Sequence, residues 1–285
     1  MLDAFGTILL GSWTRINGAG MTCPQWPACP LNGTSLWEWT HRLFAMLLLP
    51  LVIGVVVAAW KRRKAPGIAP VAVAIVALFL VQVLLGAATV HLSNSPMSVV
   101  LHWGTGMAFI AALTAMTILA SVAPGAGARN PGRGTDAIPT ALFATALLAF
   151  ATMCVGAYVS SSGAGLACIS IPGCAGNVVV YTPGQFVQML HRFVAFATTV
   201  VAAGTCALVW LRAASPRVRA TASLGLGLFF VQVLLGLLNV VLRLPMDLRE
   251  AHAANAALVF LAFVVGAIFA ALDAREPDAE AATAR

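Results

Sequence analysis

The sequence predicts an all-α integral membrane protein with eight transmembrane helices, arranged as two tandem four-helix bundles that are related by a parallel pseudo-repeat. Three observations predict this fold class. Of the 285 residues, 60% are hydrophobic and only 9% are charged, and the mean hydropathy is +0.94, whereas a soluble domain carries about 25% charged residues. Long apolar stretches recur along the chain, and the second half repeats the residue pattern of the first.

Seven apolar stretches reach the roughly 20 residues that a transmembrane helix needs. They cover residues 37–60, 71–91, 98–122, 139–160, 185–212, 220–242 and 249–272. A shorter run from Leu2 to Ile16 precedes them and is flanked by Asp3 and Arg15. We count it as a first helix, which gives eight, although it is short for a transmembrane span.

The expected organisation follows from these helices. It comprises an N-terminal four-helix bundle over 1–125, a cytoplasmic linker over 126–138, a C-terminal four-helix bundle over 139–273 and a cytoplasmic tail over 274–285.

Positive charges gather in the gaps after every second helix, and this sets the orientation. The residues are Lys61, Arg62, Arg63 and Lys64, then Arg129 and Arg133, then Arg212, Arg217 and Arg219. Cytoplasmic loops of membrane proteins collect Lys and Arg, so these gaps and both termini are expected on the cytoplasmic side. The net charge of +7 is then a matter of topology, and no basic patch with interleaved aromatic residues supports nucleic-acid binding. The two cysteine loops face outward, where disulfides persist.

An internal repeat divides the chain into two units. The string VQVLLG occurs at residues 81–86 and again at 231–236, an offset of 150. The same offset relates histidines of the two units, and an offset of 145 relates their loop cysteines. The related positions are His41 and His191, His102 and His252, Cys23 and Cys168, and Cys29 and Cys174. Because each unit has an even number of helices, both have the same orientation, which makes the repeat parallel.

Each unit offers two histidines near the outward ends of two different helices: His41 with His102, and His191 with His252. Polar residues in membrane helices are costly and usually face the bundle interior. Two imidazoles that face each other across a four-helix bundle suit axial ligation of a haem iron. The arginines near these helix ends, which would meet the haem propionates, are Arg42, Arg192 and Arg249.

Other roles for the histidines are possible from the sequence. A single histidine in a membrane helix is often a hydrogen-bonding structural residue, and a zinc or copper site would need three or four ligands close together. His91 serves as a comparison, because its repeat-related position holds Val241. We expect His91 at a loop edge with no cofactor role.

Glu38 breaks the symmetry of the repeat. It stands three residues before His41, which places both on one face of a helix, and the related position in the second unit holds Gln188. A carboxylate near the membrane interior is expensive and is a functional candidate. On this interpretation the two units have different tasks; on the alternative, Glu38 lies in water and caps the helix start.

The paired cysteines, Cys23 with Cys29 and Cys168 with Cys174, have two interpretations. A disulfide that closes each short loop would stiffen the outer surface, whereas an exposed pair would exchange electrons with an external thiol. We expect Cys154 and Cys206, which lie within spans, to be small buried hydrophobic residues.

The motifs as a set resemble the haem A synthase family, in its bacterial form with paired loop cysteines. The matching strings are GAGMTCPQWPAC, WEWTHR, VQVLLGAATV and LHW in the first unit, and GAYVSSSGAGLAC, VQMLHR, VQVLLG and EAH in the second. They extend from about Gly11 to about Phe269. The short first helix is the one departure from the family pattern.

The resemblance implies an O2-dependent oxidoreductase that converts haem O to haem A by successive hydroxylation of the C8 methyl group to a formyl group, for assembly of terminal oxidases. It implies a haem b cofactor between His191 and His252. It places His41, His102 and Glu38 on the side of the substrate haem.

The resemblance also implies a location and partners. The chain would lie in the bacterial inner membrane, receive haem O from a haem O synthase, draw reductant from a membrane electron donor or a thiol, and meet assembly factors of terminal oxidases. The runner-up is a di-haem membrane cytochrome b that transfers electrons without oxidising a substrate. A parallel-repeat transporter ranks last, because Gly and Pro lie mostly in loops rather than in mid-helix.

Overall fold

The computed structural model describes residues 1–285 with the exception of 24–32, 34, 122–136, 175, 177–178 and 275–285. The part described contains eight α-helices and one short 3-10 helix, and no strand. These elements are α1 Leu2–Ile16, α2 Leu36–Lys61, α3 Ile68–His91, α4 Pro96–Ser121, α5 Ala137–Ser161, η1 Ala164–Leu166, α6 Pro183–Leu211, α7 Pro216–Val241 and α8 Met246–Asp273.

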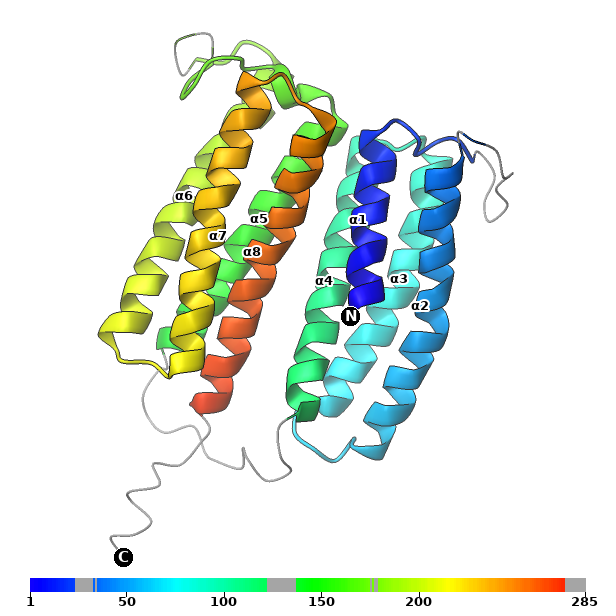
Figure 1. The fold of residues 1–285 in the computed structure, drawn as a ribbon, viewed down its shortest axis with the longest axis vertical. Helices are drawn as coiled ribbons and strands as arrows, with labels where there is room; N and C mark the ends of the chain where they lie inside the picture. The colour runs from blue at the N-terminus through cyan, green and yellow to red at the C-terminus, as the bar shows by residue number, and fades with distance from the viewer. Residues whose placement is uncertain (24–32, 34, 122–136, 175, 177–178, 275–285) are drawn as a thin grey trace, which may run out of the picture.

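The all-helical prediction is confirmed, and α2 to α8 are the seven helices in the described residues that are long and apolar enough to cross a membrane. The predicted ends agree to within four residues, with the largest difference between the predicted start at 220 and the observed start at Pro216. The eighth span is different. With 15 residues, α1 is about 22 Å long, short of the roughly 30 Å of a bilayer core. Figure 1 shows α1 beginning about halfway along its neighbours.

Three helices, α4, α6 and α7, begin at the proline of a Ser/Thr-Pro pair, and the capping hydrogen bond is made at α6 and α7. The Thr182 hydroxyl accepts a hydrogen bond from the Gln185 amide at the start of α6, and Ser215 caps α7 in the same way. Proline follows each cap, at a position where its missing N–H has no helical partner to lose. These caps set the depth at which the two helices begin.

Figure 1 shows α1 to α4 gathered in one group and α5 to α8 in another, standing side by side with their helices running up and down. One buried cluster joins side chains of α1 to α4, including Ile75 and Phe109. A second lies among α5 to α8 and includes Phe263 together with Met107 and Ile110 of α4. Because α4 packs on α5 and α8, and α1 on α8, the two groups share a continuous boundary.

Repeat-related turns adopt the same backbone. The turns before α4 and α8 each hold two residues other than glycine with positive φ, between 51° and 61°; they are Ser93, Asn94, Arg243 and Leu244. Each turn touches a repeat-related glycine. Asn94 donates to the Gly20 carbonyl at 3.0 Å, and a Cβ added to Gly165 would lie 2.8 Å from Leu244 Cδ1. The duplication in the sequence is therefore accompanied by duplicated contacts.

We predict that Gly225→Ala destabilises the protein. A Cβ at Gly225 of α7 would lie 2.8 Å from Cε2 of Phe263, whose ring is fully buried in α8. Overpacking of this kind costs about 1–3 kcal/mol, so the thermal midpoint in detergent should fall. Gly227→Ala is the matched control, since a Cβ there meets nothing within 4 Å. Equal midpoints for the two variants would contradict the close packing of α7 on α8.

Candidate functional site

Each of the four repeated histidines packs its ring against a glycine of the neighbouring helix. A Cβ added to Gly11 of α1 would lie 2.8 Å from His41 Cε1, and one added to Gly156 of α5 would lie 2.9 Å from His191 Cε1. The other two contacts are looser but equivalent, at 3.3 Å for Gly86 with His102 and 3.2 Å for Gly236 with His252. The missing Cβ lets each imidazole lie directly on a helix backbone.

The structure brings the histidines together within each half of the chain. His41 and His102 lie within electrostatic range of each other, and so do His191 and His252. All four side chains are partly buried. These interactions connect helices α2 and α4 in one half and α6 and α8 in the other.

Hydrogen bonds orient the imidazoles of His41 and His252. His41 Nδ1 lies 3.0 Å from the Thr7 carbonyl; because a carbonyl only accepts, Nδ1 carries the proton and Nε2 keeps its lone pair. A ring held in this way presents Nε2 as a metal ligand. In the C-terminal half the amide of Gln232 contacts both ring nitrogens of His252, at 3.1 and 3.2 Å. The Nδ1 atoms of His102 and His191 are buried without a hydrogen-bond partner.

The arrangement fits a porphyrin iron better than a compact metal site. No three His, Cys, Asp or Glu side chains gather into a metal cluster in the described residues. Two glycine-backed imidazoles per half are the kind of donor set that a bis-histidine haem requires, although the Gln232 amide lies within hydrogen-bond distance of both ring nitrogens of His252.

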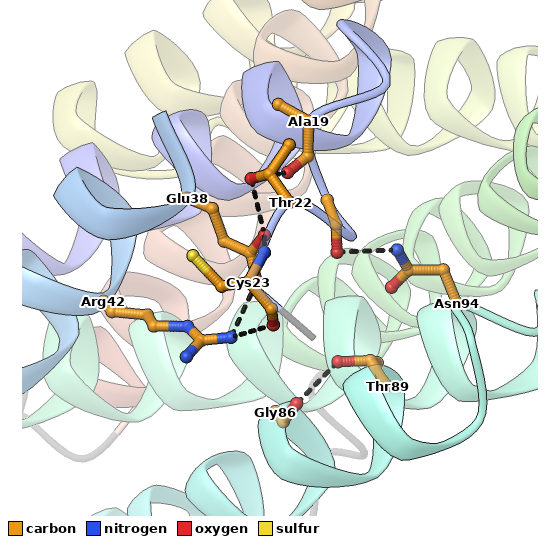
Figure 2. A network of polar contacts seen from close by, with 9 residues as sticks. Ala19, Thr22, Cys23, Glu38, Arg42, Gly86, Thr89 and Asn94 are labelled. Atoms are coloured by element: carbon orange, nitrogen blue, oxygen red, sulfur yellow. Dashed lines mark hydrogen bonds and ion pairs between the residues drawn. The ribbon is translucent and has the colours of Figure 1, made fainter. Parts of the chain in front are cut away.

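Glu38 is buried, with 5% of its surface exposed, and both of its carboxylate oxygens are engaged. One oxygen accepts from the Cys23 amide at 2.9 Å and from the Thr22 hydroxyl at 3.0 Å, and the other pairs with Arg42 at 2.7 Å. Arg42 also donates to the Cys23 carbonyl. Figure 2 shows Glu38 and Arg42 converging on the backbone of Cys23. The alternative that Glu38 lies in water is wrong, because it anchors the first cysteine loop to α2.

The C-terminal half repeats this anchor without the negative charge. Gln188 is 4% exposed, and its side chain accepts from the Cys168 amide and donates to the Gly165 carbonyl. Arg192 donates to four loop carbonyls, those of Cys168, Ser170, Pro172 and Gly173. Glu38 and Gln188 thus do the same structural work, and they differ in charge.

The anchoring arginines have consequences for the predicted propionate contacts. Arg42 and Arg192 are committed to loop carbonyls and, for Arg42, to Glu38. Of the three arginines that the sequence suggested, Arg249 is the one whose side chain makes no hydrogen bond or ion pair within the described residues. The anchors could have been suspected from the sequence, because Arg42 and Arg192 are repeat-related and adjacent to histidines.

The cysteines behave differently from one another. Cys168 and Cys174 form a disulfide, as predicted. Cys23 is fully buried and disulfide-bonded, and Cys29 lies outside the described residues. Cys206 is free and buried, whereas Cys154 is free and only half-buried.

His91 lies at the end of α3, exposed and away from the paired histidines. This is the loop-edge placement that the sequence predicted.

The chain is similar to a known protein family over most of its length. The model of the cytochrome oxidase assembly protein family, COX15-CtaA, matches residues 31–264. A protein of Shewanella oneidensis named haem A synthase is 27% identical over 90% of each chain. One of Shouchella clausii with the same name is 29% identical over 70% of this chain and 71% of its own. A protoheme IX farnesyltransferase of Halobacterium salinarum matches only 39% of this chain, at 27% identity.

We predict that Arg192→Gln loosens the second cysteine loop. The change removes the guanidinium donors to four carbonyls, and hydrogen bonds from a charged donor are worth about 1.5–3 kcal/mol each. Amide exchange in residues 168–174, followed by mass spectrometry, should accelerate at least about tenfold. Arg212→Gln, a change at an exposed arginine of another loop, is the control and should leave that exchange unchanged. Unaltered exchange in Arg192→Gln would show that the loop holds itself without this anchor.

Proposed function

Because the chain belongs to the COX15-CtaA family of cytochrome oxidase assembly proteins, we propose that it is a haem A synthase, an oxidoreductase that converts the C8 methyl group of haem O to a formyl group. The observation that carries the proposal is the repeated pair of glycine-backed histidines. It occurs in a chain whose relatives of that name match it over most of its length. The product supplies haem A for terminal oxidase assembly.

We propose that the two halves are tandem four-helix bundles related by a parallel pseudo-repeat. The N-terminal bundle covers 1–125 and the C-terminal bundle 139–273, joined by a cytoplasmic linker over 126–138 and followed by a cytoplasmic tail over 274–285. The duplicated glycine–histidine contacts and the duplicated loop anchors support this division. Helix α1 completes the N-terminal bundle only along its outer part.

The C-terminal bundle is assigned the cofactor. His191 and His252 would hold haem b, since they lie within electrostatic range of each other and each rests on a glycine. When bound, haem b supplies one-electron chemistry for the oxidation of the substrate. Gln232 contacts the ring nitrogens of His252 and so orients that ligand.

The N-terminal bundle is assigned the substrate. His41 and His102 would hold the iron of haem O, and the Thr7 carbonyl sets the tautomer of His41. Glu38, one turn before His41, carries the negative charge that the cofactor half lacks. We assign that charge to the reaction because Gln188 performs the same loop anchoring without it.

The runner-up, a di-haem cytochrome b, needs no such difference between its halves. Two neutral anchors would serve electron carriage equally well, and a buried carboxylate carries a desolvation cost even when it is paired, as Glu38 is with Arg42. The relatives named haem A synthase also favour the oxidase-assembly role.

We propose a bacterial inner membrane location with the cysteine loops outside and the C-terminus in the cytoplasm. The expected cytoplasmic N-terminus is not retained in this proposal, because α1 begins about halfway along its neighbours. Figure 1 places the loops after α1 and α5 at one end of the molecule, and the loops after α2 and α6, with their Lys and Arg residues, at the other. A haem O synthase is the proposed substrate donor, a membrane electron donor or a thiol supplies reductant, and assembly factors of terminal oxidases receive the product. The first cysteine pair, Cys23 with Cys29, is proposed as a disulfide beside the substrate.

We predict that the purified protein shows the optical spectrum of low-spin bis-histidine haem b, and that His252→Ala abolishes it. Removal of one axial ligand leaves the iron with a single imidazole. His91→Ala is the control, since His91 is exposed and unpaired, and it should keep the spectrum. A full haem b spectrum in His252→Ala would overturn the ligand assignment.

We predict that Glu38→Gln keeps haem b and folds normally but loses most haem A formation. Glutamine retains an acceptor for the Cys23 amide, as Gln188 does for Cys168, so the loop stays anchored while the charge is lost. Haems extracted after co-expression with a haem O source should show at least about a tenfold drop in the formyl porphyrin. Glu38→Ala removes both the charge and the anchor of the loop. A melting midpoint that falls in Glu38→Ala but not in Glu38→Gln separates loss of the anchor from loss of the charge. A wild-type yield of haem A from Glu38→Gln would show that Glu38 only anchors the loop.

A further inference from the structure

A half-open polar pocket of about 240 Å³ lies where the two helix groups meet, at the end of the cysteine loops. Arg15 of α1 and Arg249 of α8 line it. The lining also includes Asn94 from the turn before α4, Val99 of α4 and Ser160 of α5. None of the contacts that anchor the cysteine loops uses either of these arginines. The pocket is thus distinct from the loop anchors around Arg42 and Arg192.

Two positive charges share this pocket. Arg15 donates to the Ser160 hydroxyl at 3.1 Å, while the Arg249 side chain has no hydrogen-bond or ion-pair partner in the part of the chain that is described. The two guanidinium groups lie within electrostatic range of each other, and Glu250 also acts on Arg15. The Glu250 carboxylate, however, lines a separate apolar groove with Trp13 and Trp37. A pocket with two arginines and a net positive charge attracts an anionic oxygen group.

The repeat explains how the pocket comes to hold two cations. The position related to Arg15 is Ser160, and the position related to Arg249 is Val99; both also line the pocket. Each half therefore contributes one arginine and one small neutral residue. The junction thus holds two pairs of repeat-related positions, and in each pair only one member is an arginine.

Each arginine stands one turn outward from a histidine contact. Arg15 follows Gly11, which backs His41, by four residues, and Arg249 precedes His252 by three. At 1.5 Å per residue the displacements along the helices are about 6 and 4.5 Å. A porphyrin carries two carboxylates on one edge, and such an edge directed outward in either half would approach this junction.

We propose that the Arg15–Arg249 pocket is a carboxylate site that receives haem propionates, with Arg249 serving the haem of the C-terminal half and Arg15 the haem of the N-terminal half. The proposal rests on the proposed function, because it presupposes that the histidine pairs hold porphyrins. It assigns to this pocket the contact that Arg42 and Arg192, engaged with the loops, do not provide.

The test compares a porphyrin that has free carboxylates with one that lacks them. Apoprotein in detergent is titrated with iron protoporphyrin IX and with its dimethyl ester, and the absorbance of histidine-bound haem is followed. The wild type should prefer the free acid. Arg249→Gln should reduce that preference about tenfold, since one charge-assisted hydrogen bond is worth at least about that factor in affinity. The affinity for the dimethyl ester should not change.

Three further variants make the result specific. Arg249→Lys keeps the charge and should restore much of the preference. Arg15→Gln should weaken binding of a second equivalent of the free-acid porphyrin but not of the ester. The melting midpoint of this variant shows whether losing the hydrogen bond to Ser160 also destabilises the protein. Arg243→Gln is the matched control, because Arg243 is exposed, lies before α8 and does not line the pocket; it should behave as wild type.

Three results would overturn the proposal. If wild type and Arg249→Gln prefer the free acid over the ester to the same extent, the pocket binds no propionate. An unchanged preference with loss of a bound phospholipid from Arg249→Gln, seen by native mass spectrometry, assigns the pocket to a lipid phosphate instead. Failure of the wild type to bind either porphyrin through histidine overturns the proposed function itself, and this outcome is distinguished from the first by the missing haem absorbance.

Discussion

The contact between an imidazole ring and the bare backbone of a glycine, made four times, is the constraint on which the rest of this structure depends. A side chain at Gly11 or Gly156 would occupy the space of the ring it faces, so the glycines decide which way His41 and His191 point and how closely α1 and α5 approach their neighbours. Small residues at helix interfaces let backbones come together in membranes, where hydrophobic driving force between helices is weak. Here the approach produces two pairs of histidines, each within one half of the chain.

The cysteine loops show what the two halves share and where they differ. Glu38 and Gln188 receive the amide of Cys23 and Cys168 in the same way, and a neighbouring arginine ties each loop by its carbonyls. A neutral amide is sufficient for this anchor. The buried ion pair of Glu38 with Arg42 carries a desolvation cost that a neutral glutamine at position 38 would avoid. The charge of Glu38 therefore points to the chemistry of the N-terminal half rather than to its stability.

Much of this could be predicted from the sequence, and the remainder could not for physical reasons. Hydropathy and length predicted α2 to α8 to within four residues at each end, because a membrane span requires about 20 consecutive apolar residues. The repeat predicted the histidine pairs. The loop anchors were missed: the repeat hinted at a shared role for Arg42 and Arg192, but their partners are carbonyls whose positions depend on how the loop folds. Arg249 was predicted as a propionate contact, whereas Arg15 and the pocket that the two arginines share were missed, because the pocket forms only where two helices from different halves meet.

On the proposed function, each half of the chain would hold one porphyrin iron between its own two histidines. The most direct measurement is a cryo-electron microscopy map of the protein loaded with haem b and haem O. The account predicts two irons, one between His191 and His252 and one between His41 and His102, with the four rings still resting on their glycines. An iron bridging histidines of different halves, or imidazoles turned toward lipid, would contradict it.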